Sequence, residues 1–372
     1  MKKYMPRRVT TVLLVALTAG SVGRSQQSVA ARNIEGMPLY QGNNDQFGEI
    51  RIWGNETLLQ MLTAWELGIH EQQRGLRFSD VLPSGAAAVG ALYTGQADLG
   101  LMGHHEWPME ILAFHEVYGY DPLEIVVATG AYDVPAKMPA SVIFVNKKNP
   151  LAGLTVAQLD GIFAAQRTGG WVGTTWSTAA ARGPEKNLRT WGQLGLTGEW
   201  ADKPIHPCGY DLSANSFCLS MQRMAFGGGD MWNPAMREFA LNEVGALFRP
   251  GPRPPQGCEA IIDALAKDPY GIAYTAPQCA RKSTEVRALP LAKDAGGSFV
   301  APTPDNMANR TYPLVESIYV YINRPPGQPV EPKLKAFLTY ILSRQGQQNV
   351  LDDNGYLPLT PEAAQEQLKK LE

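Results

Sequence analysis

The stretch SGAAAVGALYTGQADLG, from Ser84 to Gly100, carries the pattern that decides the fold. A serine–glycine turn opens a helix of small residues, a second glycine at Gly95 ends it, and ADLG returns the chain to a short strand. A helix followed at once by a strand is typical of the alternating unit of an α/β sheet. The stretch therefore predicts a strand–helix–strand organisation.

The same unit recurs on both sides of this stretch. Upstream, EIRIWG alternates as a strand up to Gly54, and downstream ADLGLMG leads into the helical WPMEILAFHEVYG. A second block with its own α/β pattern begins at Ser141. Apolar residues share one face of a helix after Gly54 and of another near the C-terminus: Leu58, Leu62, Trp65 and Ile69, and Leu334, Phe337, Leu338, Ile341 and Leu342. These repeats predict largely parallel sheets covered by helices on both faces.

The first 26 residues have the composition of a secretory signal peptide. Four basic residues precede an apolar run from Val9 to about Val22, which is too short for a membrane span. We expect a signal peptide over residues 1–26, a polar linker over 27–48, and a soluble mature protein in a bacterial periplasm. Removing the signal peptide takes away five basic residues and leaves 28 against 35 acidic ones, a net charge of −7. This balance argues against nucleic acid or an anionic membrane as the partner.

The four cysteines are an even count in an exported chain, so two disulfides are expected. We favour the sequential pairing, Cys208 with Cys218 and Cys258 with Cys279, because each bond closes a local loop. Free thiols or another pairing remain alternatives on sequence alone. The spacings match no CxxC zinc or redox motif.

Five segments in order give the chain its resemblance to a known family. They are SGAAAVGALYTGQADLG, NPLAGLTVAQLDGIF, RTWGQLGLTGEWADKPI, DPYGIAYT and the C-terminal set YPLVESIYVYINRPPG, LKAFLTYILSRQGQ and GYLPL. Together they resemble the phosphate-binding periplasmic proteins of ABC importers, from about Glu49 to Pro361. The resemblance implies an α/β, two-lobe type II periplasmic binding protein fold with a hinge between the lobes.

The resemblance also implies how the chain divides. The first lobe takes residues 49–140 and 307–372, and the second lobe takes 141–306. The lobes are expected to join near 136–142 and 306–314 and to close on a ligand by a hinge motion.

Helix N-termini from both lobes are expected to hold the ligand, because their free N–H groups and positive dipole ends favour an anion. The resemblance points to three segments and one histidine, and the ligand-binding candidates are Asn55 and Thr57 in GNETL, Ser84 and Gly85 in SGAA, Tyr210, Ser213 and Asn215 in YDLSANSF, and His104. Any one of these segments alone is also an ordinary helix cap or turn.

The chain departs from the family pattern in its charged groups. No arginine occurs from Trp191 to Gln222, where a bidentate donor is expected, and His104 stands where the family places a cationic donor. A protonated oxyanion also needs an acceptor, for which Glu56, Glu106 and Asp211 are candidates. The adjacent pair His104 and His105 lacks the ligand spacing of a metal site, so no metal and no cofactor are expected.

The predicted function is an exported, non-catalytic binding protein that acts as a monomer. It would capture an oxyanion, with inorganic phosphate as the leading ligand, and deliver it to the membrane subunits of an ABC importer. One alternative is a receptor or adaptor that has lost phosphate binding and serves another ligand or a membrane sensor. A second alternative, an exported hydrolase, requires a nucleophile with a base in reach, and no motif supplies that pair.

Overall fold

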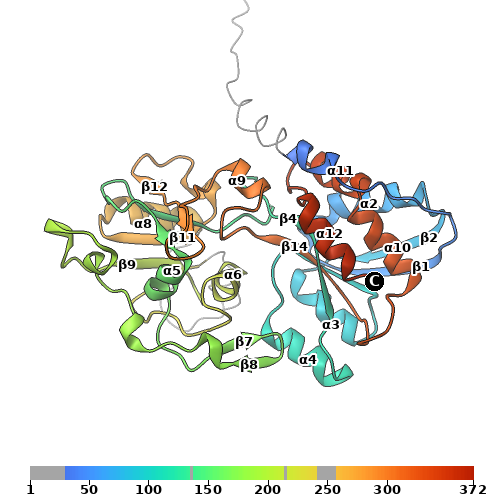
Figure 1. Cartoon of the computed structure of the whole chain (residues 1–372), viewed down its shortest axis with the longest axis horizontal. Helices are drawn as coiled ribbons and strands as arrows, with labels where there is room; N and C mark the ends of the chain where they lie inside the picture. Colours follow the sequence, from blue (N-terminus) through green and yellow to red (C-terminus); the bar gives the residue numbers. More distant parts are fainter. Residues whose placement is uncertain (1–29, 135–136, 213–215, 241–256) are drawn as a thin grey trace, which may run out of the picture.

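The computed structural model describes residues 30–134, 137–212, 216–240 and 257–372. These residues form two lobes, each built around a five-stranded sheet with helices packed on it (Figure 1). The predicted two-lobe α/β fold is confirmed, and the predicted signal peptide lies outside the described residues. Within the described ranges, no helix combines the length and the hydropathy needed to cross a bilayer.

The sheet of the first lobe has the strand order β2-β1-β3-β14-β4. Strand β1 pairs in parallel with β2 and β3, whereas β14 is antiparallel to both of its neighbours, β3 and β4. The strands are β1 (Phe47–Gly54), β2 (Gly75–Val81), β3 (Leu99–Met102), β4 (Leu123–Thr129) and β14 (Ser317–Ile322). Strand β14 is therefore the one strand of this sheet that runs against the other four.

The sheet of the second lobe has the order β10-β9-β11-β5-β12. Strand β9 is parallel to β10 and β11, and β5 is antiparallel to both β11 and β12. The strands are β5 (Val142–Asn146), β9 (His206–Tyr210), β10 (Arg237–Phe239), β11 (Gly271–Thr275) and β12 (Val286–Ala288). The prediction of largely parallel sheets thus holds, with one reversed strand in each lobe.

Helices pack on these sheets, and the second lobe also contains two short strand pairs (Figure 1). The first lobe has α2 (Leu59–His70), α3 (Ala88–Tyr93), α4 (Pro108–Tyr118), α10 (Pro332–Ile341), α11 (Arg344–Asp352) and α12 (Pro361–Lys369). The second has α5 (Val156–Phe163), α6 (Ser216–Met224), α8 (Cys258–Lys267) and α9 (Pro304–Ala308). Its short pairs are β6 (Leu154–Thr155) with β13 (Leu291–Ala292), and β7 (Gly170–Val172) with β8 (Thr175–Ser177).

Each lobe has a hydrophobic core of its own. The main core of the first lobe takes side chains from two separate parts of the chain, between Ile34 and Ala131 and from Ile318 onward, whereas the second core runs mainly from Ala140 to Leu314. All nine apolar residues predicted to share helix faces are buried. Part of the segment expected to be a linker joins the first core through Ile34, Met37 and Tyr40.

The two pairs of cysteines behave differently. Cys258, at the start of α8, is bonded to Cys279, which confirms that pairing. The predicted bond between Cys208 and Cys218 is wrong, because both remain buried thiols. The Cys208 thiol lies near the carbonyl of the first residue of β9, whereas the Cys218 thiol lies against the carbonyls at and beyond its last residue. These carbonyl groups are four to five steps of extended chain apart, about 13–16 Å, so the two thiols point to opposite ends of β9.

Candidate functional site

The parallel strands of both sheets direct their carboxyl ends at the junction between the lobes. Thr129 at the end of β4 pairs with Ser317 at the start of β14, and Thr275 at the end of β11 pairs with Val142 at the start of β5. Strands β14 and β5 each begin just after the chain has crossed between lobes. The loops that follow the parallel strands therefore gather at this junction, where open α/β sheets commonly bind ligands.

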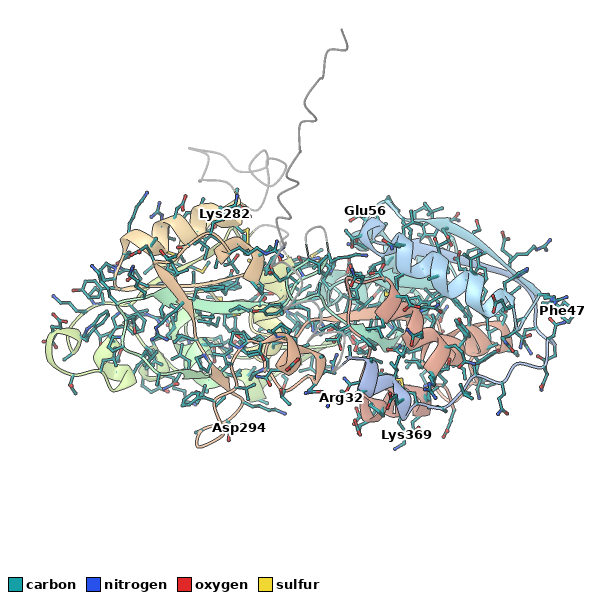
Figure 2. All side chains as sticks on the ribbon, turned by 90° about the horizontal axis from the view of Figure 1, so that it is seen from above. Arg32, Phe47, Glu56, Lys282, Asp294 and Lys369 are labelled. Atoms are coloured by element: carbon teal, nitrogen blue, oxygen red, sulfur yellow. A yellow bond between two sulfur atoms is a disulfide. The ribbon has the colours of Figure 1, made fainter. Side chains whose placement is uncertain are left out.

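Asn55 and Thr57 form the first loop, directly after β1. The Asn55 Oδ1 atom accepts hydrogen bonds from the Thr57 backbone N–H at 2.9 Å and from its hydroxyl at 2.7 Å, which caps the short 3-10 helix η2 (Glu56–Leu58). The Thr57 hydroxyl also lies 3.2 Å from the Tyr356 hydroxyl. Because Oδ1 is engaged, the Asn55 amide group keeps its Nδ2 donors for another partner. Glu56, which would repel an anion, is exposed at the surface of the first lobe (Figure 2).

Ser84 and Gly85 form the second loop, which leads into α3 through the 3-10 helix η3 (Gly85–Ala87). Ser84 is exposed, and its Oγ atom accepts a hydrogen bond of 3.3 Å from the Ala86 N–H as the cap of η3. Gly85 is buried, and a Cβ atom added to it would lie 2.8 Å from the His104 Nε2 atom and 3.6 Å from the Asn55 Nδ2 atom. The structure therefore brings four predicted residues together: Asn55, Ser84, Gly85 and His104.

His104 belongs to the third loop, after β3. Its Nδ1 atom lies 2.6 Å from the carbonyl oxygen of His105, and because a carbonyl can only accept, Nδ1 must carry the proton. His104 is 8 % exposed, and burial lowers the pKa of its imidazole, against the opposing influence of the His105 carbonyl and Glu106. The expected cationic donor is thus a neutral ring at pH 7 with its Nε2 atom directed at Gly85.

A cation does reach this region, from a residue that sequence reasoning missed. The Arg223 guanidinium, on α6 of the second lobe, donates to the Glu106 carboxylate at 2.6 Å and to its backbone carbonyl at 3.1 Å. Both side chains are nearly buried, with 14 % and 5 % exposure. The segment without an arginine, Trp191 to Gln222, ends one residue before Arg223 in the sequence. Its place in the helix that follows Asn215 is the signal that could have found it.

Three ionisable groups near Arg223 lie close enough to hold an ion. A His105 nitrogen and carboxylate oxygens of Glu106 and Glu124 lie within 4.8 Å of one another. Each already has a protein partner, since the Tyr319 hydroxyl lies 2.8 Å from His105 Nε2 and the Tyr321 hydroxyl hydrogen-bonds both carboxyl groups. Burial and the neighbouring Glu106 raise the pKa of Glu124. Hydrogen bonds from the two tyrosine hydroxyls therefore already occupy the His105 ring and both carboxyl groups. We assign no metal ion to this cluster.

The candidates from the second lobe are placed differently. Ser213 and Asn215 lie outside the described residues. Tyr210 is buried at the end of β9, where its ring stacks on Phe217 and its hydroxyl lies 2.6 Å from the Thr275 hydroxyl. The structure does not bring Tyr210 together with the residues of the first lobe.

A second contact between the lobes lies at the tip of the β7–β8 hairpin. The Thr174 hydroxyl donates to the Asp121 carboxylate at 2.9 Å, and the same carboxylate oxygen lies 2.8 Å from His115 Nδ1. Thr174 belongs to the second lobe, whereas Asp121 and His115 belong to the first. The hairpin and α6 therefore bridge the lobes at two separate places.

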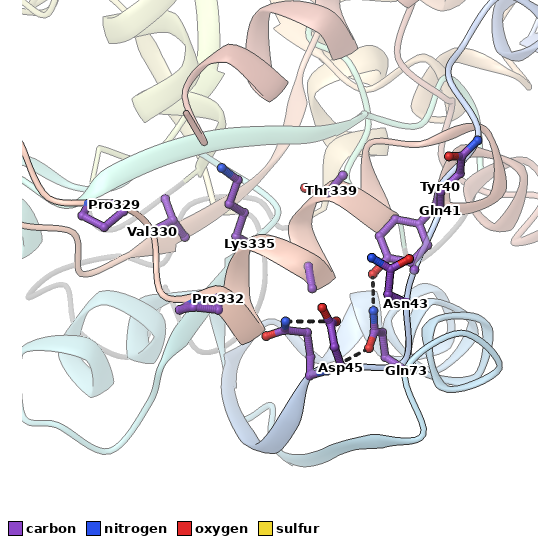
Figure 3. A pocket seen from close by; sticks show the side chains of 13 residues that line it. Tyr40, Gln41, Asn43, Asp45, Gln73, Pro329, Val330, Pro332, Lys335 and Thr339 are labelled. Carbon is purple, nitrogen blue, oxygen red and sulfur yellow. Dashed lines mark hydrogen bonds between the residues drawn. The ribbon is translucent and has the colours of Figure 1, made fainter.

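Two of the cavities in the described part of the chain are larger than 400 Å³ and lie away from the junction. One, of about 410 Å³, lies between the segment before β1 and helix α10, and its polar groups are partly engaged with one another: Gln73 donates to the Tyr40 hydroxyl and accepts from the Gln46 N–H (Figure 3). The other, of about 500 Å³, lies beside β9 and is lined by Cys208 and Arg237, among others. Neither contains a predicted ligand-binding residue.

Comparisons with known proteins identify the family of this chain. A family model described as a PBP superfamily domain matches residues 41–345. Two relatives from strains of Pseudomonas aeruginosa, both named phosphate-binding protein PstS, are 31 % identical over 359 residues, which covers 96 % of this chain and 98 % of theirs. Among solved structures, PstS from Borrelia burgdorferi is 15 % identical with a TM-score of 0.49 and covers 84 % of this chain and 99 % of its own.

Proposed function

Since the chain belongs to the PBP superfamily, we propose that it is a non-catalytic binding protein that holds a small oxyanion, inorganic phosphate in the first place, between its two lobes. It would act in the periplasm and deliver the anion to the membrane subunits of an ABC importer. The near full-length relatedness to proteins named for phosphate binding supports this ligand. Lobe closure would follow from the higher affinity of the closed form for the ligand.

The observation that carries the proposal is the convergence at one junction of polar groups from separate loops. Asn55 and His104 meet around Gly85, at the start of the segment leading into α3. The absence of a side chain at Gly85 leaves room for an anion to approach the Gly85 backbone N–H, because the N–H groups of the next residues are already bonded within the turn. Ser213 and Asn215, which precede Ser216 in the sequence and lie outside the described residues, remain predicted donors.

Calorimetric titration of ligand-stripped, refolded protein tests the proposal. Phosphate is titrated first, followed by sulfate, arsenate and a phosphonate. We expect phosphate to bind with a micromolar or lower Kd. No heat with any of these oxyanions would refute the oxyanion site and favour a receptor for a different ligand.

A matched pair of serine caps separates binding from folding in this test. Ser84 caps η3 by accepting from an N–H at 3.3 Å, and Ser177 caps the 3-10 helix η4 (Thr178–Ala180) of the second lobe in the same way at 3.2 Å. Either Ser→Ala change should cost about 1 kcal/mol of stability. Only Ser84→Ala should weaken phosphate binding, and equal binding by both variants would count against the placement of the site.

A further inference from the structure

We propose that the cavity of about 500 Å³ beside β9 is a second binding site, which takes a small amphipathic carboxylate with its apolar body inside the cavity and its charged group against Arg237. The cavity is lined from the starts of the parallel strands β9 and β10 and from the end of α8. The proposed oxyanion site lies at the opposite, carboxyl ends of the parallel strands. The inference is therefore independent of the proposed function.

The buried part of the cavity wall is apolar. Ile205 and Cys208 are 6 % and 5 % exposed, Pro207 between them is buried, and Ala264 of α8 also lines the cavity. Burial raises the pKa of the Cys208 thiol to about 11, so the thiol is neutral at pH 7 and belongs to this apolar surface. Sites for small organic molecules are typically cavities of roughly 300–1,000 Å³ with mainly apolar walls and a few polar groups. This cavity has that size and that kind of wall.

The polar group available to a ligand is the guanidinium of Arg237. Arg237 is exposed on β10, the edge strand of its sheet, and it lines the cavity. Its guanidinium carbon lies over the Phe239 ring, 4.8 Å from the ring centroid, and forms no ion pair with a carboxylate among the described residues. The stacking contact holds the cation in place and leaves its N–H donors for an anion.

The other charged groups of the lining are already engaged. The Arg189 guanidinium donates to backbone carbonyls at the end of α5. The Asp268 Oδ2 atom lies 2.7 Å from His206 Nδ1, and Oδ1 accepts from the Tyr270 N–H at 3.0 Å. The lining thus offers a cation without a counter-ion and no carboxylate without a partner, which favours an anionic ligand over a cationic one.

The apolar wall decides which kind of anion suits the cavity. An inorganic oxyanion would meet one guanidinium and would leave the apolar surface in contact with water. A carboxylate that carries an alkyl chain satisfies both parts of the site, because each methylene group that it buries increases the affinity by up to about 4-fold. A medium-chain carboxylate such as decanoate is therefore the probe that this cavity calls for.

Calorimetric titration of the delipidated mature protein with decanoate, hexanoate and decanol tests both parts of the site. Decanoate should bind more than about 10-fold more tightly than hexanoate, because its chain is four methylene groups longer. It should bind about 5-fold more tightly than decanol, which has the same chain and no charge, because one ion pair at a partly exposed position contributes about that much. No binding of decanoate, or equal binding of decanoate and decanol, would overturn the inference.

Two substitutions separate the charge from the apolar wall. Arg237→Gln should lower decanoate affinity about 5-fold, to that of decanol, and leave decanol binding unchanged. Its control is Arg77→Gln, at an exposed arginine on β2, the edge strand of the other sheet, which should change neither affinity. Ala264→Leu should lower both affinities at least about 10-fold by filling the cavity, and leucine suits its position within α8. Wild-type decanoate binding by both Arg237→Gln and Ala264→Leu would overturn the inference.

A photoreactive probe locates the bound chain directly. A decanoate analogue with a diazirine at the chain end should label the peptides that contain residues 204–208 or 264–268, as identified by mass spectrometry. Labelling confined to the loops of the first lobe would overturn the inference. Phosphate titrations keep this result separate from the proposed function, since Arg237→Gln and Ala264→Leu should bind phosphate as the wild type does. A wild-type protein that binds decanoate but no oxyanion would refute the proposed function and leave the second site standing.

Discussion

Replacing Gly85 by alanine should weaken phosphate binding while preserving the fold, because the new methyl group would meet the His104 ring. The Cβ atom would lie 2.8 Å from the His104 Nε2 atom, whereas ordinary contacts begin near 3.4 Å. The ring would have to retreat by about 0.6 Å, and its Nδ1 atom is held by the His105 carbonyl at 2.6 Å. The φ angle of Gly85 lies outside the left-handed region, so the backbone itself tolerates alanine.

The size of the effect follows from overpacking. A methyl group forced into a filled site costs about 1–3 kcal/mol, which in a chain of this size lowers Tm by roughly 2–6 °C. The methyl group and the displaced His104 ring would also narrow the approach to the Gly85 backbone N–H, where we place the anion. Phosphate affinity should therefore fall by more than about 10-fold, a loss larger than 1.4 kcal/mol of binding free energy.

A glycine on the helix that follows supplies the control. An added Cβ at Gly90, within α3, would meet only the Tyr93 hydroxyl, at an ordinary 3.8 Å. Gly90→Ala should leave phosphate binding unchanged and should raise stability by up to about 1 kcal/mol, because alanine favours a helix. Differential scanning calorimetry and isothermal titration of both variants provide the two readouts. Wild-type phosphate affinity in Gly85→Ala would refute the placement of the anion beside this residue.

Three other predictions concern the hinge, the lobe contact and the disulfide. Burial raises the pKa of Glu316 to about 7, above its ordinary 4.5, so its ionisation should reduce stability as the pH rises from about 4.5 through 7. Glu316→Gln should therefore increase the free energy of unfolding more at pH 8 than at pH 5, by on the order of 3 kcal/mol, as measured by thermal unfolding. An equal effect at both pH values would contradict this reasoning. Arg223→Gln should leave the Glu106 carboxylate without its cation, which should lower stability by about 3 kcal/mol. It should also enlarge the radius of gyration measured by small-angle scattering. An unchanged radius would mean that other contacts hold the lobes together. Thiol labelling of the denatured, unreduced mature protein should modify two cysteines, whereas four labelled thiols would exclude the bond. Removing the Cys258–Cys279 bond, which spans 21 residues, should lower the free energy of chemical unfolding by about 3 kcal/mol.

Most of the fold could be predicted because the signals are local. The alternation in EIRIWG marks β1, and the spacing of Leu58, Leu62, Trp65 and Ile69 marks the buried side of the helix that follows. The reversed direction of β5 and β14 could not be read locally. It depends on where the chain crosses between lobes, because each of these strands enters its sheet from the junction.

The site was predicted less completely because its chemistry depends on contacts between distant residues. The resemblance to the binding-protein family pointed to Asn55, Gly85 and His104, which lie together in the structure. The charge of His104 could not be predicted, since it is set by burial and by the His105 carbonyl. The contact between Arg223 and Glu106 joins residues 117 positions apart in different lobes, and no local pattern encodes it.

Helix α6 connects the parts of the molecule that a closing motion must coordinate. Phe217 packs on Tyr210 in the core of the second lobe, Ser220 lies beside the Glu316 carboxyl at the junction and lowers its pKa, and Arg223 reaches Glu106 in the first lobe. These contacts recur every three residues, so a short rigid helix touches one lobe, the hinge and the other lobe in turn. A rotation of the lobes cannot leave all three contacts unchanged. The cation that the sequence pattern lacked at the start of α6 therefore lies where it can couple the position of the lobes to the loop that carries His104.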